Sequence, residues 1–473
     1  RPPRATPTRP PPAPAVFPRS TLRFPPHLSD DSLMSTMTQR PVVDCTTLAK
    51  QTSANRVSKM ASGLVGSEIL KIAGEIRAMI KGGKKICNLT VGDFDPKQFP
   101  IPVKLKNEIG KALEKGETNY PPSDGVMDLR QAVQRYYERE LGLKYPVESF
   151  LICGGARPAI YGTYRTLVDP GDKVVYPLPS WNNNHYIHQL GAVGVKVPCT
   201  PENKFLPTLA DLQPAFAGAR LVCLNSPLNP TGTAIEPAAL RAICEGIVAE
   251  NRRREEKGER PLFLMYDHVY WPLCVGETKH VTPPELVPEM ARWTVFVDGI
   301  SKAFAATGVR VGWAVGPVDV IERMSAILGH VGAWAPRAEQ VATVALLDDP
   351  AACSEFSKTF MAGVTRRLDA LHAGFQKMKS RGLPVDSIAP MGGIYLTVRI
   401  HPFGKKAASG SALKTNEDIR RYVLDAAAIG IVAFQAFGAP DESGWFRLSV
   451  GAVSEADIAE ALPRLEAALA ALS

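Results

Sequence analysis

The sequence predicts an α/β fold, with a doubly wound, mostly parallel sheet in a large domain and a smaller α+β domain after it. Three observations support this prediction. The chain has 473 residues, enough for one large and one small domain. Between residues 150 and 297, short β-branched runs alternate with helical stretches, as in parallel sheets with helical connections. After about residue 350, a helical region is followed by two strand-like runs and an Ala-rich helix.

Residues 1–44 differ from the rest of the chain. Ten prolines fall within the first 26 residues, the first acid is Asp30, and no apolar periodicity is visible. Such a segment buries too little to offset its ordering entropy, so we expect a disordered Pro/Arg-rich tail. The Arg-rich, acid-poor composition is also typical of an organelle transit peptide, although dense proline spoils the amphipathic helix of many such peptides. Alternatively, Met34 or Met37 begins the folded part.

Three further segments are expected. Residues 45–90 contain an amphipathic helix over 68–80, which ends at two glycines and packs with the small domain. Residues 91–345 form the large domain, with a helix from about 126 to 141. Its six expected strands begin at Phe150, Lys173, Val193, Arg220, Pro261 and Trp293. Residues 346–473 form the small domain, with strands near Gly393 and Trp445. The charged run 251–260 is interpreted as a solvated helix end and loop.

Composition excludes several classes of protein. The hydrophobic content of 45% and charged content of 22% are ordinary for a soluble enzyme, and no apolar run is long enough to span a membrane. We therefore expect a cytoplasmic protein, unless residues 1–44 direct it to an organelle. A net charge of +8 without a basic, aromatic-rich stripe gives little support to nucleic-acid binding. Eight scattered cysteines and no His-Glu-x-x-His pattern predict free thiols and no metal.

The segment from Asp298 to Trp313 is the most informative part of the sequence. It holds Lys302 among small residues, where desolvation lowers the pKa of the amine and allows Schiff-base formation with carbonyls. Arg310, eight residues later, can clamp a phosphate. A single lysine is usually a solvated surface residue, so this interpretation depends on the rest of the chain. A Schiff-base lysine and a phosphate clamp are what a pyridoxal phosphate enzyme requires.

Other candidate residues follow the predicted strands. Gly154-Gly155-Ala156-Arg157 opens a helix whose free N–H groups suit a phosphate, although an ordinary turn is equally compatible. Trp181 follows a strand end and could stack on a planar cofactor, or be a core residue.

Three later motifs are more specific. Asn229 stands in a loop that two X-Pro bonds stiffen. Asp267 closes an apolar strand, and at that depth its carboxylate can keep a pyridine nitrogen protonated, while Tyr270 can tune the ring oxygen. Arg447 lies in a predicted strand of the small domain, where it can grip a substrate carboxylate.

In this order the motifs resemble those of fold-type I pyridoxal phosphate enzymes, specifically the class I/II aminotransferases of the aspartate aminotransferase superfamily. The resemblance covers about residues 60 to 470. Its most specific pieces are Asn-Pro-Thr-Gly at 229–232, Asp-x-x-Tyr at 267–270, Ser-Lys-x-Phe-x-x-x-Gly-x-Arg-x-Gly-Trp at 301–313 and Arg447. It implies the fold-type I PLP-transferase fold, pyridoxal 5′-phosphate as the cofactor, and a ping-pong transfer of an amino group.

The resemblance also implies a role for each residue. Lys302 would form the Schiff base and move the proton, Asp267 would pair with the ring nitrogen, and Tyr270 and Asn229 would hydrogen-bond the ring's phenolic oxygen. Trp181 would stack on the ring and contact substrate. The residues implied around the phosphate are Gly155, Ala156, Arg157, Gly299 and Arg310. Those implied at the substrate α-carboxylate are Arg447, Asn229 and the backbone of Gly92. Tyr120 would reach the partner's phosphate, which implies a homodimer with shared active sites.

The sequence departs from the family in three places. Residues 92–102 lack the common Gly-Glu-Pro-Asp form and resemble a bacterial-type subgroup. The run 251–260 lengthens the spacing before Asp267. The region 326–337 lacks the arginine with which animal-type aspartate enzymes bind a second carboxylate, and His330 or Trp334 lies near that position.

The substrate pair stays open. Aspartate or glutamate with a 2-oxo acid such as 2-oxoglutarate is the leading prediction. An aromatic, prephenate or alanine aminotransferase, and a C–S β-lyase or decarboxylase on the same fold, are alternatives. A non-catalytic regulator that senses pyridoxal phosphate is disfavoured, because such proteins usually carry a DNA-binding helical domain ahead of the fold, and none fits here.

Overall fold

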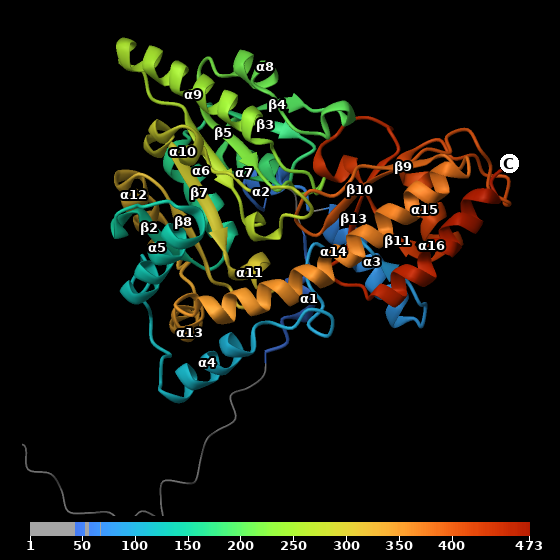
Figure 1. Ribbon diagram of the computed structural model, residues 1–473, viewed down its shortest axis with the longest axis horizontal. Helices are drawn as coiled ribbons and strands as arrows, with labels where there is room; N and C mark the ends of the chain where they lie inside the picture. The colour runs from blue at the N-terminus through green and yellow to red at the C-terminus, as the bar shows by residue number, and fades with distance from the viewer. Residues whose placement is uncertain (1–42, 53–55, 67) are drawn as a thin grey trace, which may run out of the picture. The chain divides into compact units, whose positions relative to one another are not determined.

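The computed structural model describes residues 43–52, 56–66 and 68–473, and Figure 1 shows its helices and strands. The chain divides into two compact units, Arg1–Arg56 and Val57–Ser473. In the first unit, one short helix, α1 (Thr46–Ala49), is described. The predicted disorder of residues 1–44 therefore lies almost entirely outside the described residues. The sheets and the site residues belong to the second unit.

Seven strands form a mixed, mostly parallel sheet in the order β2-β8-β7-β6-β5-β3-β4. The strands are β2 (Phe150–Cys153), β3 (Lys173–Leu178), β4 (Val193–Pro198), β5 (Ala219–Asn225), β6 (Phe263–Asp267), β7 (Thr294–Gly299) and β8 (Gly312–Val315). Only β8 runs antiparallel to its neighbours, β2 and β7. The prediction of a doubly wound, mostly parallel sheet is confirmed. The sequence analysis missed β8, which has four residues and begins with a glycine.

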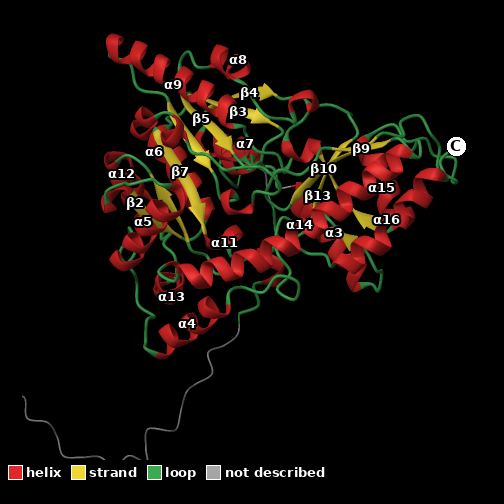
Figure 2. Cartoon of the chain, viewed as in Figure 1, coloured by secondary structure: helices red, strands yellow, loops and turns green. Residues whose placement is uncertain are grey.

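Helices cover this sheet and bury it (Figure 2). Helix α6 (Ala156–Leu167) packs against β6, β7 and β8, and α5 (Met127–Leu141) packs against β2. Buried side chains on these elements belong to one large apolar cluster. The other helices of this part are α4 (Val103–Glu114), α7 (Asn183–Leu190), α8 (Leu209–Leu212), α9 (Pro237–Lys257), α10 (Pro283–Leu286), α11 (Ile300–Ala303), α12 (Val318–Val331) and α13 (Arg337–Leu347).

A second, antiparallel sheet has the strand order β12-β13-β10-β9. Its strands are β9 (Val385–Ser387), β10 (Tyr395–Ile400), β12 (Val432–Ala433) and β13 (Trp445–Ser449). Three helices accompany it, α14 (Pro350–Ser380), α15 (Asn416–Ala427) and α16 (Glu455–Ala470). This α+β arrangement agrees with the sequence pattern after residue 350.

The segment before the large sheet packs with this second sheet. Helix α3 (Glu68–Lys81) buries Ile72 and Ile76 in a cluster that includes Val432 and Trp445. Strand β1 (Cys87–Asn88) pairs in parallel with β11 (Ile429–Gly430). Helix α2 (Lys59–Gly63) precedes them and contacts α7. The domain boundaries at 90 and 345 stay predictions.

The interpretation of residues 251–260 as a solvated segment is wrong for two of its members. Helix α9 extends into the run, and Asn251 and Arg254 are buried. Arg254 donates to the carbonyls of Phe216 and Ala219, and Asn251 exchanges two hydrogen bonds with the backbone of Leu262. These side chains tie the end of α9 to the start of the sheet, which a count of charged residues does not reveal.

Among the described residues, no helix combines the length and the hydropathy that crossing a membrane requires. The eight cysteines form no disulfide.

Candidate active site

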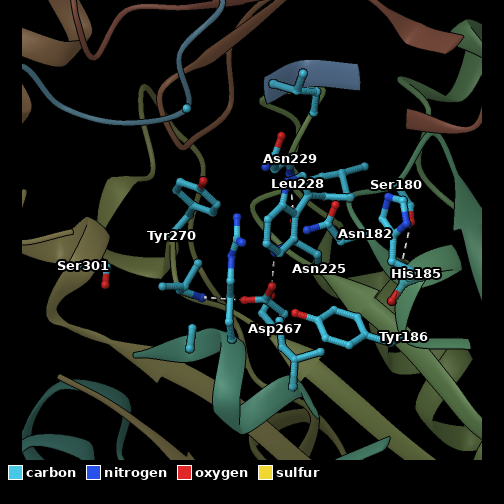
Figure 3. A pocket seen from close by; sticks show the side chains of 18 of the residues that line it. Ser180, Asn182, His185, Tyr186, Asn225, Leu228, Asn229, Asp267, Tyr270 and Ser301 are labelled. Atoms are coloured by element: carbon cyan, nitrogen blue, oxygen red, sulfur yellow. Dashed lines mark hydrogen bonds between the residues drawn. The ribbon is translucent and has the colours of Figure 1, made fainter. Parts of the chain in front are cut away.

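A cavity of about 900 Å³ opens at the carboxyl ends of the parallel strands, where ligands bind in such sheets. Figure 3 shows side chains that line it, including Asp267 and Tyr270 after β6 and Asn229 from the loop after β5. Lys302 from α11 and Arg447 from β13 line the same cavity. The structure therefore brings together side chains that are up to 218 residues apart in sequence.

Lys302 is half-buried and its amine faces into the cavity. Its Nζ donates to the Gly92 carbonyl at 2.6 Å and lies 5.6 Å from the ring centroids of Phe94 and Tyr270. Removal from water lowers the pKa of the amine to about 8, against a smaller opposing effect of the Asp93 carboxylate. A substantial fraction of the amine is therefore neutral and nucleophilic near neutral pH.

Asp267 ends β6, and burial raises the pKa of its carboxyl to about 6. Its carboxylate accepts a hydrogen bond of 3.3 Å from the Val269 backbone N–H, and no cation among the described residues lies within salt-bridge distance. The Asn225 side chain donates to the Asp267 carbonyl and accepts from the Asn229 N–H, at 2.7 Å each. The Asn229 loop is thereby tied to the strand end that carries Asp267.

Arg447 is 1% exposed and lies where the two sheets approach each other. One guanidinium nitrogen donates to the Asn229 side-chain oxygen at 3.2 Å, and the other donates to the Thr90 carbonyl. Its Nε has no hydrogen-bond partner among the described residues. The positive charge of a buried guanidinium that has no carboxylate partner is poorly neutralised. This position therefore favours binding of an anionic ligand.

Tyr395 is a site residue that the sequence analysis missed. It comes from β10, and its hydroxyl lies 2.7 Å from that of Tyr270. Its ring lies 4.8 Å from the Arg447 guanidinium, and its hydroxyl would be 2.8 Å from a Cβ at Gly92. The sequence carries no local signal for this role, because Tyr395 reads as an ordinary residue of a buried strand.

The turn after β2 and Arg310 form the other end of the site. Arg310 donates to the carbonyls of Thr307 and Gly154, at 2.7 Å each. Gly155 has a φ of +97°, and a Cβ there would lie 2.1 Å from the Arg310 guanidinium. The chain then enters α6 at Ala156, so the free N–H groups of the first turn lie beside the Arg310 cation.

Two other predicted phosphate residues are placed differently. The Arg157 guanidinium lies 4.8 Å over the ring of Trp181, and both side chains line the cavity. Gly299 is buried outside the cavity lining, at the start of α11, and a Cβ there would be 2.7 Å from the backbone of Gly312. Gly299 is therefore required for close packing of β7 against β8.

Besides Gly155 and Gly299, three more predicted residues lie outside the cavity lining. Tyr120 is 81% exposed and packs edge-to-face with Trp334 at 5.4 Å. Neither Trp334 nor His330 lines the cavity. Residues that do line it, and that the sequence analysis missed, include Arg77 from α3 and His185 from α7. Arg77 belongs to an α3 face with Ile69 and Ala73, a spacing of four residues that could have indicated it.

A half-buried lysine and a half-buried aspartate share a cavity at the carboxyl edge of a doubly wound sheet. This combination of fold and site is that of the fold-type I transferases. Comparisons with known proteins agree. The model of the aminotransferase class I and II family matches residues 84–465. The chain belongs to this family, and it is an enzyme of the transaminase type.

Individual relatives cover most of the chain. It is 31% identical to an aspartate aminotransferase of Rhizobium meliloti (strain 1021), over 89% of this chain and 97% of that protein. It is 29% identical to a probable aspartate/prephenate aminotransferase of Rhizobium leguminosarum bv. phaseoli, over 85% of this chain and 95% of the relative. A crystal structure of the Rhizobium meliloti aspartate aminotransferase superposes with a TM-score of 0.80 at 31% identity, over 88% of this chain and 100% of that chain.

Proposed function

We propose that this chain is a pyridoxal phosphate-dependent amino-acid aminotransferase that acts on aspartate or glutamate and on a 2-oxo acid such as 2-oxoglutarate. The observation that carries the proposal is that one cavity presents the Lys302 amine, the Asp267 carboxylate and the Arg447 guanidinium. Bound pyridoxal phosphate supplies an aldehyde that condenses with amines and a ring that withdraws electrons from the substrate Cα.

The residues around the cavity fit this cofactor. Asp267 is a buried carboxylate that lacks a cationic partner, which suits a protonated ring nitrogen. Arg310, with the α6 N-terminus, suits a phosphate. Trp181 offers a ring face, and the Tyr270 hydroxyl and Asn229 amide offer hydrogen bonds for the ring oxygen.

In the proposed reaction each residue has one task. Arg447 binds the substrate α-carboxylate with Asn229, and so orients the Cα–H bond. With the cofactor bound, the neutral Lys302 amine would stand in the same cavity as the substrate Cα–H bond and could take up that proton at its Nζ. Asp267 keeps the ring nitrogen protonated and Tyr270 holds the ring oxygen.

Charge in the cavity favours a substrate with two carboxylates. The lining contains three more cations than carboxylates: Arg77, Arg157, Lys302, Arg310 and Arg447 against Asp93 and Asp267. A phosphate and one α-carboxylate engage Arg310 and Arg447. Arg77 and Arg157, which have no carboxylate partner among the described residues, remain for a side-chain carboxylate. Aspartate and glutamate carry this group, and two relatives have aspartate in their names.

We also propose a homodimer with shared active sites. Tyr120 is exposed outside the cavity of its own chain, so its hydroxyl is free to reach the phosphate of a second copy. Apolar residues such as Val103 and Leu113 on α4 are also exposed. Analytical ultracentrifugation of the full chain should give twice the monomer mass, and a monomer at micromolar concentration contradicts the shared site.

The substrate assignment predicts which amino acids change the spectrum of the cofactor-loaded enzyme. L-Aspartate and L-glutamate should convert it to the amino form of the cofactor at low millimolar concentration or below. L-Alanine and L-phenylalanine, which lack the second carboxylate, should do so with kcat/KM at least about tenfold lower. Preference for a neutral or aromatic amino acid contradicts the dicarboxylate assignment. Release of pyruvate and ammonia without an oxo acid would indicate a β-lyase.

Gly155→Ala should weaken cofactor binding. The new Cβ would overlap the Arg310 guanidinium at 2.1 Å, and alanine is strained at a φ of +97°. We expect the dissociation constant of pyridoxal phosphate to rise about tenfold or more, since about 1.4 kcal/mol corresponds to a factor of ten. Gly171→Ala is the matched control, because its φ is +87° and nothing lies within 4 Å of the added atom. Equal dissociation constants for the two variants contradict the proposed phosphate site.

A further inference from the structure

A buried hydrogen-bonded cluster lies behind the cavity, and the proposed reaction uses none of its side chains. Its six members, which we call the Asp298 cluster, are Tyr137, His268, Trp271, His280, Asp298 and Trp313. None of them lines the cavity. Tyr137, His268, Asp298 and Trp313 are at most 1% exposed. Such a polar cluster is costly unless its groups are satisfied, so its hydrogen bonds identify what it holds in place.

Three donors converge on the Asp298 carboxylate. One oxygen accepts the Gly299 backbone N–H at 2.7 Å. The other accepts the Trp271 indole N–H at 3.1 Å and the Tyr137 hydroxyl at 3.2 Å. Gly299 is the next residue along β7 and precedes α11, whereas the other two donors come from the turn Trp271–Leu273 after β6 and from α5. The carboxylate therefore links the end of β7, where the chain turns into α11, to these two elements.

The remaining hydrogen bonds show which atom donates and which accepts at each step of the cluster. Since the Tyr137 hydroxyl donates to Asp298, its oxygen accepts from the Trp313 indole at 3.2 Å and from His268 Nε2 at 3.0 Å. His268 Nδ1 is then left as an acceptor, and His280 Nε2 lies 3.3 Å from it. This pattern requires His268 to be neutral and His280 to donate through its Nε2. Burial agrees with it, because it lowers the pKa of His268 and brings that of His280 to about 3.

The cluster joins the two strand ends that carry the chemistry. Strands β6 and β7 are parallel neighbours with Asp267 opposite Val297, and the His268 N–H donates to the Val297 carbonyl at 3.2 Å. Side chains alternate between the faces of a strand, so His268 faces away from the cavity that Asp267 lines. Asp298 follows Val297 and meets His268 on that hidden side, 3.7 Å away. Four residues after Asp298, α11 presents Lys302 to the cavity.

Asp298 has no cationic partner to hold its charge. Among the described residues, no lysine or arginine lies within 4 Å of it. The titratable groups that face it are Tyr136 and Tyr137 from α5 and Asp267 and His268 from β6. Burial raises the pKa of Asp298 to about 7, against the lowering effect of its hydrogen bonds. The carboxylate thus accepts hydrogen bonds from a backbone N–H, an indole N–H and a phenol. Such a group is suited to keep the segments that carry these donors in fixed positions.

We propose that Asp298 is a positioning residue for Lys302. Its carboxylate holds the backbone at Gly299, where β7 turns into α11, from the side of the sheet away from the cavity. Through Tyr137 and His268 it also fixes this turn relative to the end of β6, which carries Asp267. The inference rests on the proposed role of Lys302. Proton transfer requires the amine at a defined place, and a misplacement of about 1 Å can cost about 100-fold in rate. Binding of the substrate carboxylate depends on Arg447, which the cluster does not touch.

Asp298→Asn tests this role with nearly unchanged volume. An amide presents one acceptor and one donor, so at least one of the three N–H or O–H donors loses its partner. We expect kcat for transamination to fall by about 10- to 100-fold, while KM for the amino acid and the cofactor dissociation constant stay within about twofold. In the wild type, kcat should also decline as pH falls through about 7, because the protonated carboxyl loses acceptor capacity. The variant should keep only the decline that protonation of Lys302 causes near pH 8.

Tyr137→Phe provides a second test if the first variant folds poorly. It removes the hydroxyl that links His268 to Asp298 and keeps the ring, so kcat should fall several-fold with KM unchanged. Tyr145→Phe is the matched control, because that buried hydroxyl has no hydrogen-bond partner in the described part of the chain and its ring also packs on Phe296. We expect it to match the wild type in kcat.

The possible outcomes distinguish a failure of the proposed role of Asp298 from a failure of the proposed function. A lower melting temperature with an unchanged kcat of the folded enzyme, for both cluster variants, would mean that the cluster is only structural, and would overturn the inference. A rise in KM with constant kcat would overturn it as well. If the wild type itself shows no transamination that depends on Lys302, the proposed function fails, whatever the cluster variants do.

Discussion

We expect Lys302→Ala to abolish the visible absorption of the lysine-bound cofactor and to lower kcat by about 10⁴-fold, the upper end of the range for one acid–base group. The structure supplies one amine at the required place, since Lys302 is the only lysine that lines the cavity among the described residues. Alanine leaves the Arg310 end and the Asp267 carboxylate intact, so the variant should still bind pyridoxal phosphate, but without a covalent bond. Absorption spectra before and after gel filtration, with single-turnover rates, measure both effects.

A surface lysine provides the control for this substitution. Lys358 on α14 is exposed, and Lys358→Ala should keep the absorption, the cofactor and the rate of the wild type. If the visible band and the turnover persist in Lys302→Ala, another amine carries the chemistry and the proposed mechanism is wrong.

The low pKa of Lys302 adds a pH signature. The amine attacks only in its neutral form, and its pKa of about 8 lies below the ordinary lysine value of 10.5. The rate at which the cofactor-free enzyme captures pyridoxal phosphate should therefore rise with pH and level off above about pH 8. An exposed lysine would still gain reactivity up to about pH 10. A capture rate that keeps rising through pH 10 would contradict the desolvation of Lys302.

Much of this site could be predicted from sequence because the chemistry follows strand ends. Asp267 closes β6, the Gly154 turn follows β2, and Lys302 follows β7. In a parallel sheet these carboxyl ends meet at one edge, so a correct strand assignment also places the residues. Asn229 was predictable in the same way, since its loop follows β5.

Other features depend on tertiary packing and could not be read from local pattern. Tyr395 reaches Tyr270 from a different sheet, and nothing near it in sequence marks that contact. Asp298 was treated only as the start of the lysine motif, because Tyr137 and Trp271, which donate to its carboxylate, lie on other elements. The sequence analysis did not predict that α3 lines the cavity. Its apolar periodicity shows which face is buried, but not that part of this face borders a ligand cavity. His330 and Trp334 were named from their position in the family pattern, and neither lines the cavity. Position in sequence does not show which way a side chain points.

Arg447→Lys should cause the second largest loss of activity. A lysine keeps the charge but cannot make the two parallel hydrogen bonds that a guanidinium offers a carboxylate. It also cannot reproduce the present contacts with the Asn229 side chain and the Thr90 carbonyl. Disrupting a buried, hydrogen-bonded charge pair costs about 2–5 kcal/mol, or roughly 30-fold to several thousand-fold in kcat/KM for the amino acid.

Whether the loss appears in KM or in kcat distinguishes a role of Arg447 in substrate binding from a structural role. Arg447 contacts Asn229 and Thr90, and neither holds Arg310, which binds the carbonyls of Thr307 and Gly154. The cofactor dissociation constant should therefore not change, while KM rises for both the amino acid and the oxo acid. Arg323→Lys, at an exposed position on α12, controls for the exchange itself. Because Arg447 is 1% exposed, some loss of stability is expected, and rates must be normalised to the amount of cofactor bound. A uniform fall in kcat with unchanged KM would instead assign Arg447 to the architecture between the sheets and leave the substrate carboxylate without its proposed partner.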